Sequence, residues 1–449
     1  MHRRAFLETI AGGLAAASSA RAASKPNFVV LFADDLGYGD LGCYGHPTIR
    51  TPHLDRMAAE GARFTQFYAA APVCTPSRAA LLTGRLPIRS GLTRVLFPYS
   101  DGGIPDHEVT IAEALKPAGY ATACVGKWHL GHLPQYLPTR HGFDRYFGIP
   151  YSNDMARPFA TGPRYNPGPP LPLLRNEEMI ETNPDQAELT PRYTAEATAF
   201  IRESARARKP FFLYLPYTFP HVPLFASARF KGKSARGLYG DVVEEIDWSV
   251  GEILGALRQS KVDRDTLVLF TSDNGPWLVK KEEGGSAGLL REGKGSTWEG
   301  GMREPFLARW PGRIRAGTVS AEFGSTMDLF PTCLAAAGVP LPPGIAFDGQ
   351  DLGPYLRQEK SGREALLFYY SDTELRAVRK GPWKLHVASN APWEGPPGVQ
   401  KHDPALLFHL LHDPSERYDV AAKHPDVVRA LLGAIEEHRR TLTPGALQR

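Results

Sequence analysis

Four short runs of apolar residues constrain the fold of this chain more than any other feature. The first reads Phe-Val-Val-Leu-Phe at positions 28–32, and similar runs lie at 121–125, 211–215 and 266–270. Such continuous runs are typical of strands buried on both faces of a mostly parallel sheet. Helical patterns separate them at 51–61, 76–83 and 109–119. This alternation predicts a doubly wound α/β domain.

A smaller unit is expected after the proline- and glycine-rich segment 339–347. Short strand patterns lie near 365–370, 375–379, 383–387 and 406–409, and a helical pattern covers about 425–441. Together they predict a small antiparallel sheet packed by one helix. Two proline-rich stretches, 151–189 and 391–404, are predicted to be loop-rich insertions near the mouth of a site. We therefore divide the chain into an N-terminal segment 1–22, a large α/β domain 23–345 and a C-terminal α+β subdomain 346–449.

The first 22 residues have the layout of an export signal. Arg3 and Arg4 precede a stretch of small apolar residues, and Ala20-Arg21-Ala22 offers a cleavage site. The paired arginines favour the twin-arginine variant of such signals. The alternative is a buried amphipathic first helix. With cleavage we expect a periplasmic or secreted protein, and no membrane span after it, because no later run of eighteen apolar residues occurs.

Charge and cysteine content narrow the classes of function. The formal net charge is +4, and the first 22 residues carry three of the arginines and one glutamate, so the remaining chain has a charge of only +2. We therefore expect no nucleic-acid partner. The cysteines, Cys43, Cys74, Cys124 and Cys333, are too few for a disulfide scaffold and form no C-x-x-C pair, which disfavours a structural zinc site. A single disulfide stays open.

Two pairs of oxygen-bearing side chains directly follow predicted buried strands. Asp34-Asp35 come after the first strand, and Asp273-Asn274 come after the run at 266–270. In an open parallel sheet both pairs fall on the same edge, where such folds bind ligands. Each pair alone is an ordinary turn sequence, but adjacent carboxylates repel each other unless a cation lies between them. Together the pairs predict a site for a hard cation, calcium or magnesium in preference to zinc.

A cysteine begins a predicted helix at Cys74-Thr75-Pro76-Ser77-Arg78. Pro76 suits a first helical turn, which puts Cys74 at the positive end of the helix. Arg78 lies four residues on, on the same helical face, where it can hold an anion or orient residue 74. The alternative for an isolated cysteine is a reduced, buried thiol beside a helix cap.

Four sequence blocks resemble those of the type I sulfatases, in the family's order. They are DDLGYGD at 34–40, CTPSR followed by AALLTGR at 74–85, GKWHLG at 126–131 and GKGSTWEGG at 293–301. The likeness runs from about residue 26 to residue 419 and is strongest to the branch of arylsulfatase A and N-acetylgalactosamine-6-sulfatase. It implies an alkaline phosphatase-like α/β fold, with a large mixed sheet flanked by helices. It also implies that Cys74 is oxidised to formylglycine, or 3-oxoalanine, by a maturation enzyme.

Carried over by position, the resemblance implies one calcium ion bound by Asp34, Asp35, Asp273, Asn274 and the modified residue Cys74. The other matching site positions are Arg78, Lys127, His129, Ser152, His221 and Lys294. A sulfate ester needs cations around its oxygens and a proton for its leaving alcohol, and these residue types supply both. His221 lies between two prolines, where a purely structural histidine is the alternative. Ser152 rests on the short stretch 148–152 alone.

The resemblance implies hydrolysis of aryl or, in nature, carbohydrate sulfates through a formylglycine hydrate and a covalent sulfo-enzyme intermediate. One hydroxyl of the hydrate attacks sulfur, while His221, helped by Lys294, protonates the departing alcohol. His129 then deprotonates the second hydroxyl, and sulfate leaves. Two alternatives stay open: a formylglycine-type phosphonate monoester hydrolase or phosphodiesterase of the same fold, and a catalytically inactive glycan-binding homologue that never acquires the aldehyde.

Overall fold

The computed structural model of the protein describes residues 25–160, 168–359, 366–390 and 398–449. Its centre is a sheet of ten strands: β1 (Asn27–Ala33), β2 (Ala62–Tyr68), β3 (Ala121–Val125), β4 (Arg145–Gly148), β5 (Pro172–Arg175), β6 (Glu178–Thr182), β7 (Phe211–Pro216), β8 (Thr266–Ser272), β9 (Arg303–Arg309) and β10 (Thr318–Ser325). They are arranged in the order β10-β2-β9-β8-β1-β7-β3-β4-β5-β6. The predicted export segment 1–22 lies outside the described residues and stays a prediction.

The central strand β1 shows why the apolar runs form this sheet. It pairs in parallel with β7 on one side and β8 on the other. Phe28, Val30 and Phe32 belong to the core on one face of the sheet, whereas Val29 and Leu31 belong to the core on the opposite face. Each successive side chain is therefore buried, as a continuous apolar run requires.

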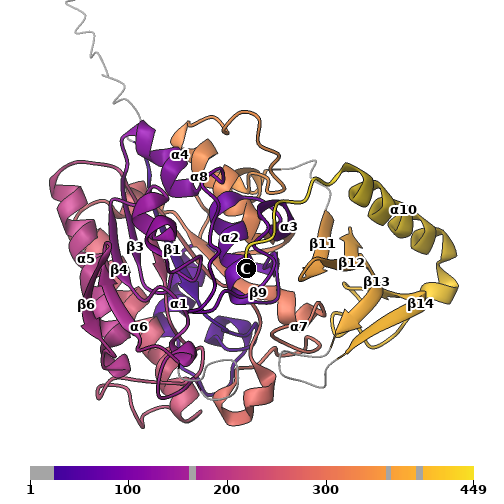
Figure 1. Cartoon of the computed structure of the whole chain (residues 1–449), viewed down its shortest axis with the longest axis horizontal. Coiled ribbons are helices and arrows are strands. Elements are labelled where there is room, and N and C mark those ends of the chain that lie inside the picture. The colour runs from indigo at the N-terminus through magenta and orange to yellow at the C-terminus, as the bar shows by residue number, and fades with distance from the viewer. Residues whose placement is uncertain (1–24, 161–167, 360–365, 391–397) are drawn as a thin grey trace, which may run out of the picture.

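Helices cover both faces of the large sheet (Figure 1). In chain order the helices of the protein are α1 (Pro52–Glu60), α2 (Cys74–Thr83), α3 (Pro87–Ser90), α4 (Ile111–Leu115), α5 (Leu189–Arg206), α6 (Leu238–Gln259), α7 (Glu299–Met302), α8 (Leu329–Ala337), α9 (Gly353–Leu356) and α10 (Pro425–Thr441). Apolar residues of α1, α5 and α6 pack in the core that contains Val29 and Leu31, and those of α2, α4 and α8 pack in the core that contains Phe28, Val30 and Phe32. Because β9 runs antiparallel between β2 and β8, the sheet is mixed, and the predicted fold class is confirmed.

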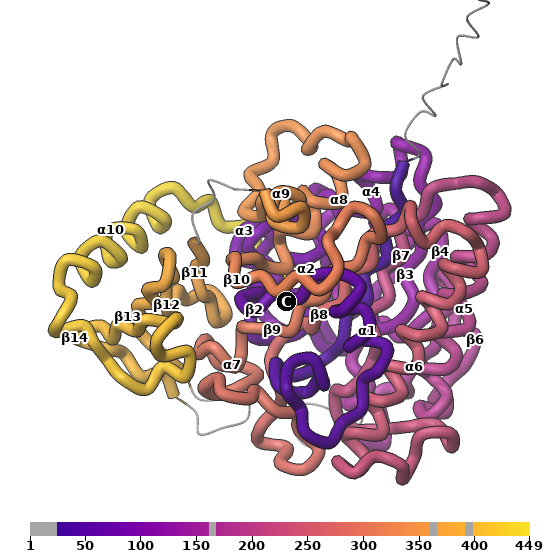
Figure 2. The backbone as a smooth tube through the Cα atoms, turned by 180° about the vertical axis from the view of Figure 1, so that it is seen from behind, coloured from indigo at the N-terminus to yellow at the C-terminus, as the bar shows by residue number. Residues whose placement is uncertain are grey.

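A four-stranded antiparallel sheet forms the C-terminal part, with β11 (Leu366–Ser371), β12 (Glu374–Lys380), β13 (Trp383–Asn390) and β14 (Val399–His409) in sequential order. Leu431 and Ile435 of α10 pack against this sheet, in a core that also takes Tyr68 and Met302 from the large sheet's side. Views from both sides place α10 and α5 at opposite ends of the molecule (Figures 1 and 2).

Several local predictions need correction. The stretch 151–189 is not all loop, because it contains β5 and β6. Residues 399–404, predicted to be loop, belong to β14, while 391–397 lie outside the described residues. The helix predicted over 109–119 is a short α4 followed by a 3-10 turn, because Pro117 has no backbone N–H with which to continue it. Leu352, directly before α9, and Leu356 within it pack into the core that contains Phe28, Val30 and Phe32, while the domain boundary at 345 stays a prediction.

Two further properties bear on the sequence predictions. Among the described residues, none of the helices combines the length and apolar character needed to cross a membrane.

All four cysteines are free thiols, so this structure contains no disulfide between them. Cys74, Cys124 and Cys333 are buried.

Candidate functional site

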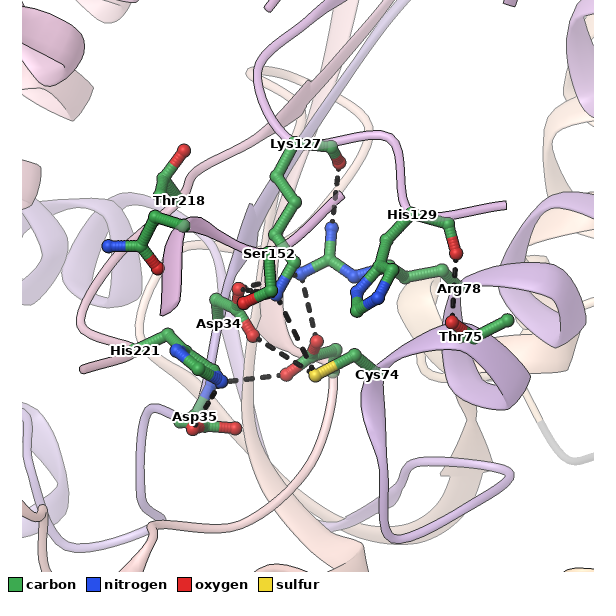
Figure 3. Close-up of polar contacts among 12 residues, drawn as sticks. Asp34, Asp35, Cys74, Thr75, Arg78, Lys127, His129, Ser152, Thr218 and His221 are labelled. Carbon is green, nitrogen blue, oxygen red and sulfur yellow. Dashed lines mark hydrogen bonds and ion pairs between the residues drawn. The ribbon is translucent and has the colours of Figure 1, made fainter. Parts of the chain in front are cut away.

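The predicted site residues meet at the carboxyl ends of four adjacent strands. The strands β8, β1, β7 and β3 are neighbours in the sheet. Asp273 and Asn274 follow β8, Asp34 and Asp35 follow β1, His221 follows β7, and Lys127 and His129 follow β3. Cys74, at the first turn of α2, faces this edge (Figure 3). The same-edge placement predicted from the sequence is therefore present in the structure.

Asp34 lies between cationic side chains and residue 74. Its carboxylate pairs with the Lys127 ammonium and lies 3.3 Å from the Arg78 guanidinium. Cys74 Sγ is 3.5 Å from Asp34 Oδ1 and 3.8 Å from Lys127 Nζ, and Lys127 also donates to Ser152 Oγ at 3.0 Å. Burial alone would raise the pKa of Asp34, but the charges of Lys127 and Arg78 outweigh it and hold that pKa well below its ordinary value. Asp34 is therefore an anion.

Asp35 organises the other half of the site. Its carboxylate accepts hydrogen bonds from Asn274 Nδ2 at 2.7 Å and from Lys294 Nζ at 2.9 Å. His221 Nε2 lies 3.6 Å from Asp35 Oδ2, and the ring's Nδ1 contacts the carbonyl of Val222. Although burial opposes it, the charge of Asp35 raises the pKa of Lys294 above its ordinary value, so this lysine keeps its proton.

Burial and positive charge act together on His221. Burial first, and then the charges of Lys294 and Lys127, hold the pKa of His221 well below its ordinary value. Its ring is therefore neutral in the protein alone. The Nδ1–H donates to the Val222 carbonyl, which leaves Nε2 directed at the site (Figure 3).

The carboxylate and amide oxygens of the cluster are the donors that a hard cation prefers. Asp34, Asp35, Cys74 and His221 offer ligand atoms that all lie within 4.8 Å of one another. Asp273 is adjacent, since its Oδ1 accepts from the Asp35 backbone N–H at 3.1 Å while its Oδ2 pairs with Arg78 at 2.8 Å. Within the described parts of the chain, Oδ1 of Asn274 is buried without a hydrogen-bond partner. A buried amide oxygen lacking a partner is costly unless a ligand occupies it.

His129 is held in one tautomer by the backbone. Its Nε2 contacts the carbonyl oxygen of Leu96 at 2.9 Å, so Nε2 carries the hydrogen and Nδ1 holds a free lone pair. That Nδ1 is buried and has no hydrogen-bond partner among the residues described. Burial, reinforced by the charges of Lys127 and Arg78, keeps the pKa of His129 well below its ordinary value. A neutral ring with an available lone pair, lying near residue 74, has the form that a general base requires (Figure 3).

Two site residues adopt backbone conformations that side chains other than glycine rarely take. Asp35 has φ 62° and His129 has φ 60°. Hydrogen bonds hold both: Asp35 N–H donates to Asp273, and His129 N–H donates to the carbonyl of Pro150 at 3.1 Å. Strained backbone of this kind gathers at functional sites, where the surrounding structure compensates for it. Both residues are thus aimed by the fold and not by local preference.

The structure also brings in residues that the sequence did not single out. Trp277 places its ring 4.1 Å from Lys294 Nζ and 5.2 Å from the ring of His221. Thr75 donates to the His129 carbonyl at 2.9 Å and accepts from the Leu96 N–H at 3.2 Å. Asp154, next to the Lys127–Ser152 pair, has a buried Oδ1 with no partner in the described residues. Trp277 could have been singled out by its closeness in sequence to Asp273, and Asp154 by its closeness to Ser152.

Family models, known proteins and a solved structure resemble this chain over most of its length. Residues 26–339 match the family model described as Sulfatase, and 361–449 match that of the C-terminal region of aryl-sulfatase. Arylsulfatase A of Homo sapiens is 44% identical over 462 residues, covering 95% of this chain and 89% of its own. N-acetylgalactosamine-6-sulfatase of Canis lupus familiaris is 42% identical over 485 residues, covering 99% and 91%. The crystal structure of PsFucS1 sulfatase from Pseudoalteromonas sp. superposes with a TM-score of 0.85 at 31% identity, covering 93% and 90%.

Proposed function

The chain belongs to the sulfatase family of sulfuric ester hydrolases, and on this premise we propose that it hydrolyses sulfate monoesters with a formylglycine made from Cys74. The surroundings of residue 74 carry the proposal. Its side chain is buried between the Asp34 carboxylate at 3.5 Å and the Lys127 ammonium at 3.8 Å. Burial raises the pKa of the Cys74 thiol well above its ordinary value, and a protonated thiol is a poor nucleophile. An unmodified cysteine therefore has no evident role here.

One calcium ion would be held by Asp34, Asp35, Asp273, Asn274 and the oxygen at residue 74. Carboxylate and amide oxygens are the donors that this cation prefers, and the unpartnered Oδ1 of Asn274 supports the assignment. When bound, calcium supplies positive charge that lowers the pKa of an oxygen ligand and offsets charge on the ester.

Three buried cations of this chain would bind the sulfate group. Lys127, Lys294 and Arg78 surround residue 74 from different elements, and each is fixed by a carboxylate. Fixed donors cost little reorganisation when charge develops on the ester oxygens. Ser152 accepts from Lys127 and so holds that ammonium in place beside the substrate. The three carboxylates of the same cluster, Asp34, Asp35 and Asp273, make the site better suited to a singly charged ester than to a doubly charged one.

In the first chemical step, one hydroxyl of the formylglycine hydrate gives up its proton to solvent, its oxygen forms a bond to sulfur, and the bond from sulfur to the alcohol oxygen breaks. The departing alcohol takes a proton from His221, with Lys294 as the neighbouring donor. His221 is neutral in the protein alone because burial and two lysines lower its pKa. The anionic ester favours the protonated ring, and Nε2 then presents that proton to the leaving oxygen.

In the second step, His129 acts as the base. Its Nδ1 takes the proton of the second hydroxyl on residue 74, the carbon–oxygen bond to the sulfuryl group breaks, and sulfate leaves as the aldehyde re-forms. The fixed tautomer of His129 supports this role, since the lone pair on Nδ1 has no hydrogen-bond partner among the described residues. Water then adds to the aldehyde and restores the hydrate.

Further proposals concern the setting of the reaction. Relatives named arylsulfatase A and N-acetylgalactosamine-6-sulfatase support an aryl or carbohydrate sulfate as substrate, and we favour a sulfated saccharide in nature. Formation of the aldehyde requires a formylglycine-generating maturation enzyme and an external oxidant. The N-terminal pattern at 1–22 supports export to the periplasm or the medium, with removal of the segment from the exported protein.

The proposal is tested by comparing two esters with one leaving group. We expect 4-nitrophenyl sulfate to be hydrolysed with a much higher kcat/KM than 4-nitrophenyl phosphate. A higher value for the phosphate would overturn the assignment and favour the phosphonate hydrolase or phosphodiesterase alternative. Mass measurement of the peptide bearing residue 74 separates an enzyme from an inactive glycan-binding homologue, because only the enzyme carries the aldehyde.

A further inference from the structure

The loop at 91–104 provides the carbonyl that fixes the tautomer of His129. Leu96 of this loop accepts from His129 Nε2 at 2.9 Å, and its own N–H donates to Thr75 Oγ1 at 3.2 Å. The Thr75 hydroxyl in turn donates to the His129 carbonyl at 2.9 Å. Ile104 at the far end of the loop donates to the Leu130 carbonyl at 2.8 Å. The orientation of His129 therefore depends on where this loop lies.

The small C-terminal sheet holds the loop at 91–104 through Asp372. Asp372 occupies the turn between β11 and β12, with φ 56°. Its carboxylate accepts from Thr93 Oγ1 at 2.9 Å and from Arg94 Nε at 2.7 Å. Thr93 is buried, so its hydroxyl has lost water and depends on this partner. A single turn of the C-terminal sheet thus holds the segment three residues before Leu96.

Residues 445–449, here called the tail, hold both ends of the same loop. From α10 the chain returns to the large domain and ends beside α3 (Figure 1). Gly445 donates to the carbonyl of Ile88 at 2.9 Å, Gln448 donates to that of Gly91 at 3.0 Å, and Gly102 donates to that of Arg449 at 2.6 Å. The approach is too close for side chains, because a Cβ at Gly445 would lie 2.3 Å from the Arg89 carbonyl oxygen.

We propose that Asp372 and the tail are positioning residues for His129, acting through the 91–104 loop, so that the C-terminal part of the chain controls the release of sulfate. The inference rests on the proposed function, in which His129 is the base of the second step. The two supports, Asp372 and the tail, lie more than 270 positions after Thr93 and Arg94 of the loop in the sequence. In the part of the chain that the structure describes, no hydrogen bond or ion pair joins either support to residue 74, so the first step should proceed when they are lost.

A displaced base has a kinetic signature that loss of stability lacks. If attack on sulfur is intact and release is slow, the sulfo-enzyme accumulates, and both kcat and KM fall together. An aryl sulfate should then give a burst of about one phenol per enzyme before a slow steady state. Misplacement of a catalytic group by about 1 Å costs up to about a hundredfold in rate. We therefore expect kcat to fall about ten- to a hundredfold.

Two variants, each with a matched control, test the inference. Gly445→Ala pushes the tail from the loop, whereas Gly433→Ala makes the same change on α10, where nothing lies within 4 Å of the added carbon. Asp372→Gly removes the carboxylate and suits the positive φ, whereas Glu374→Gln alters a side chain that pairs with Arg376 of its own strand. Asp372→Asn keeps an acceptor for Thr93 and should restore most of the rate.

We expect Gly445→Ala and Asp372→Gly, but not their controls, to show a burst of phenol and a sulfuryl adduct in the intact mass during turnover. The same two variants should show faster amide hydrogen exchange at Leu96 and Ile104. Exchange at parent rates in both variants would overturn the inference. So would a fall in kcat without burst or adduct, because that pattern indicates a structural role. Exchange needs no turnover, and failure of the proposed function shows in the parent protein as absence of sulfate release, so the two failures are distinguishable.

Discussion

Replacement of Glu299 with glutamine tests how the C-terminal sheet is held against the large domain. Glu299 begins α7, five residues after Lys294, and its side chain is fully buried. It accepts hydrogen bonds from Tyr68 Oη of β2 at 2.7 Å and from Lys384 Nζ of β13 at 2.9 Å. Lys384 also pairs with Glu416 at 3.1 Å. One carboxylate therefore joins strands of both sheets at a point near the site.

The size of the effect follows from the pKa of Glu299. Burial alone would raise it, but the charges of Lys384, Arg303 and Arg379 outweigh burial and lower the pKa from 4.5 to about 2. At 1.36 kcal/mol per unit, the ionised carboxylate stabilises the folded state by about 3 kcal/mol. Because the folded pKa is the lower one, this contribution is complete above the unfolded value of 4.5 and is lost as the pH falls through about 2.

Urea unfolding of the parent, Glu299→Gln and Glu374→Gln measures this contribution. At pH 7 we expect Glu299→Gln to lower the free energy of unfolding by about 3 kcal/mol, since Lys384 keeps only one carboxylate partner. Glu374 pairs with Arg376 at 2.8 Å but is 64% exposed, so its replacement should cost less than about 1 kcal/mol. The difference between parent and Glu299→Gln should shrink toward pH 2. Equal destabilisation by the two changes at pH 7, or a difference that grows in acid, would refute the reasoning.

Two other predictions concern the site. Elemental analysis should find one calcium and no zinc per chain, because the proposed ligands are hard oxygens; stoichiometric zinc, with activity that survives removal of calcium, would contradict this. Trp277→Leu removes a ring 4.1 Å from Lys294, a buried cation–π contact worth about 2 kcal/mol, so kcat/KM for an aryl sulfate should fall about thirtyfold. The control Trp310→Leu removes a longer, surface cation–π contact with Arg313, 5.7 Å from the ring centroid, and should leave kcat/KM unchanged; equal losses from both changes would argue against a role for Trp277.

Local sequence patterns predicted the elements whose type follows from the spacing of their own apolar side chains. The continuous apolar run predicted β1 and its parallel neighbours, and the apolar stripe of α10 predicted that helix over Pro425–Thr441. Strand ends at Asp34 and Asp273 could be placed on one edge because parallel strands end together. The antiparallel insertion of β9 could not be predicted, since alternation and apolar content do not specify a strand's partner.

Contacts between distant segments account for the rest of what the sequence did not reveal. Leu96 acts through a backbone carbonyl, which any residue carries, so no side-chain pattern marks it. Asp372 has an ordinary turn sequence, and its role depends on Thr93, 279 positions earlier in the chain. Asp34, Asp35, Asp273, Asn274, Cys74 and Arg78 stood out by residue type and spacing. The other candidate site residues followed from the family resemblance, and the elements that orient them depend on tertiary packing.

The most direct test of the proposed chemistry is the fate of sulfate on Cys74→Ser, produced in a host whose maturation system oxidises only cysteine. Position 74 then carries one hydroxyl in place of two, while Arg78, Lys127 and Lys294 are unchanged. Attack on sulfur remains feasible, but His129 has no second hydroxyl to deprotonate, so the sulfuryl group should stay bound.

Excess aryl sulfate should therefore release at most about one phenol per enzyme, and the intact mass should show one added sulfuryl group on residue 74. Sustained turnover by Cys74→Ser, with no sulfuryl group at position 74, would mean that water attacks sulfur directly and would contradict the account.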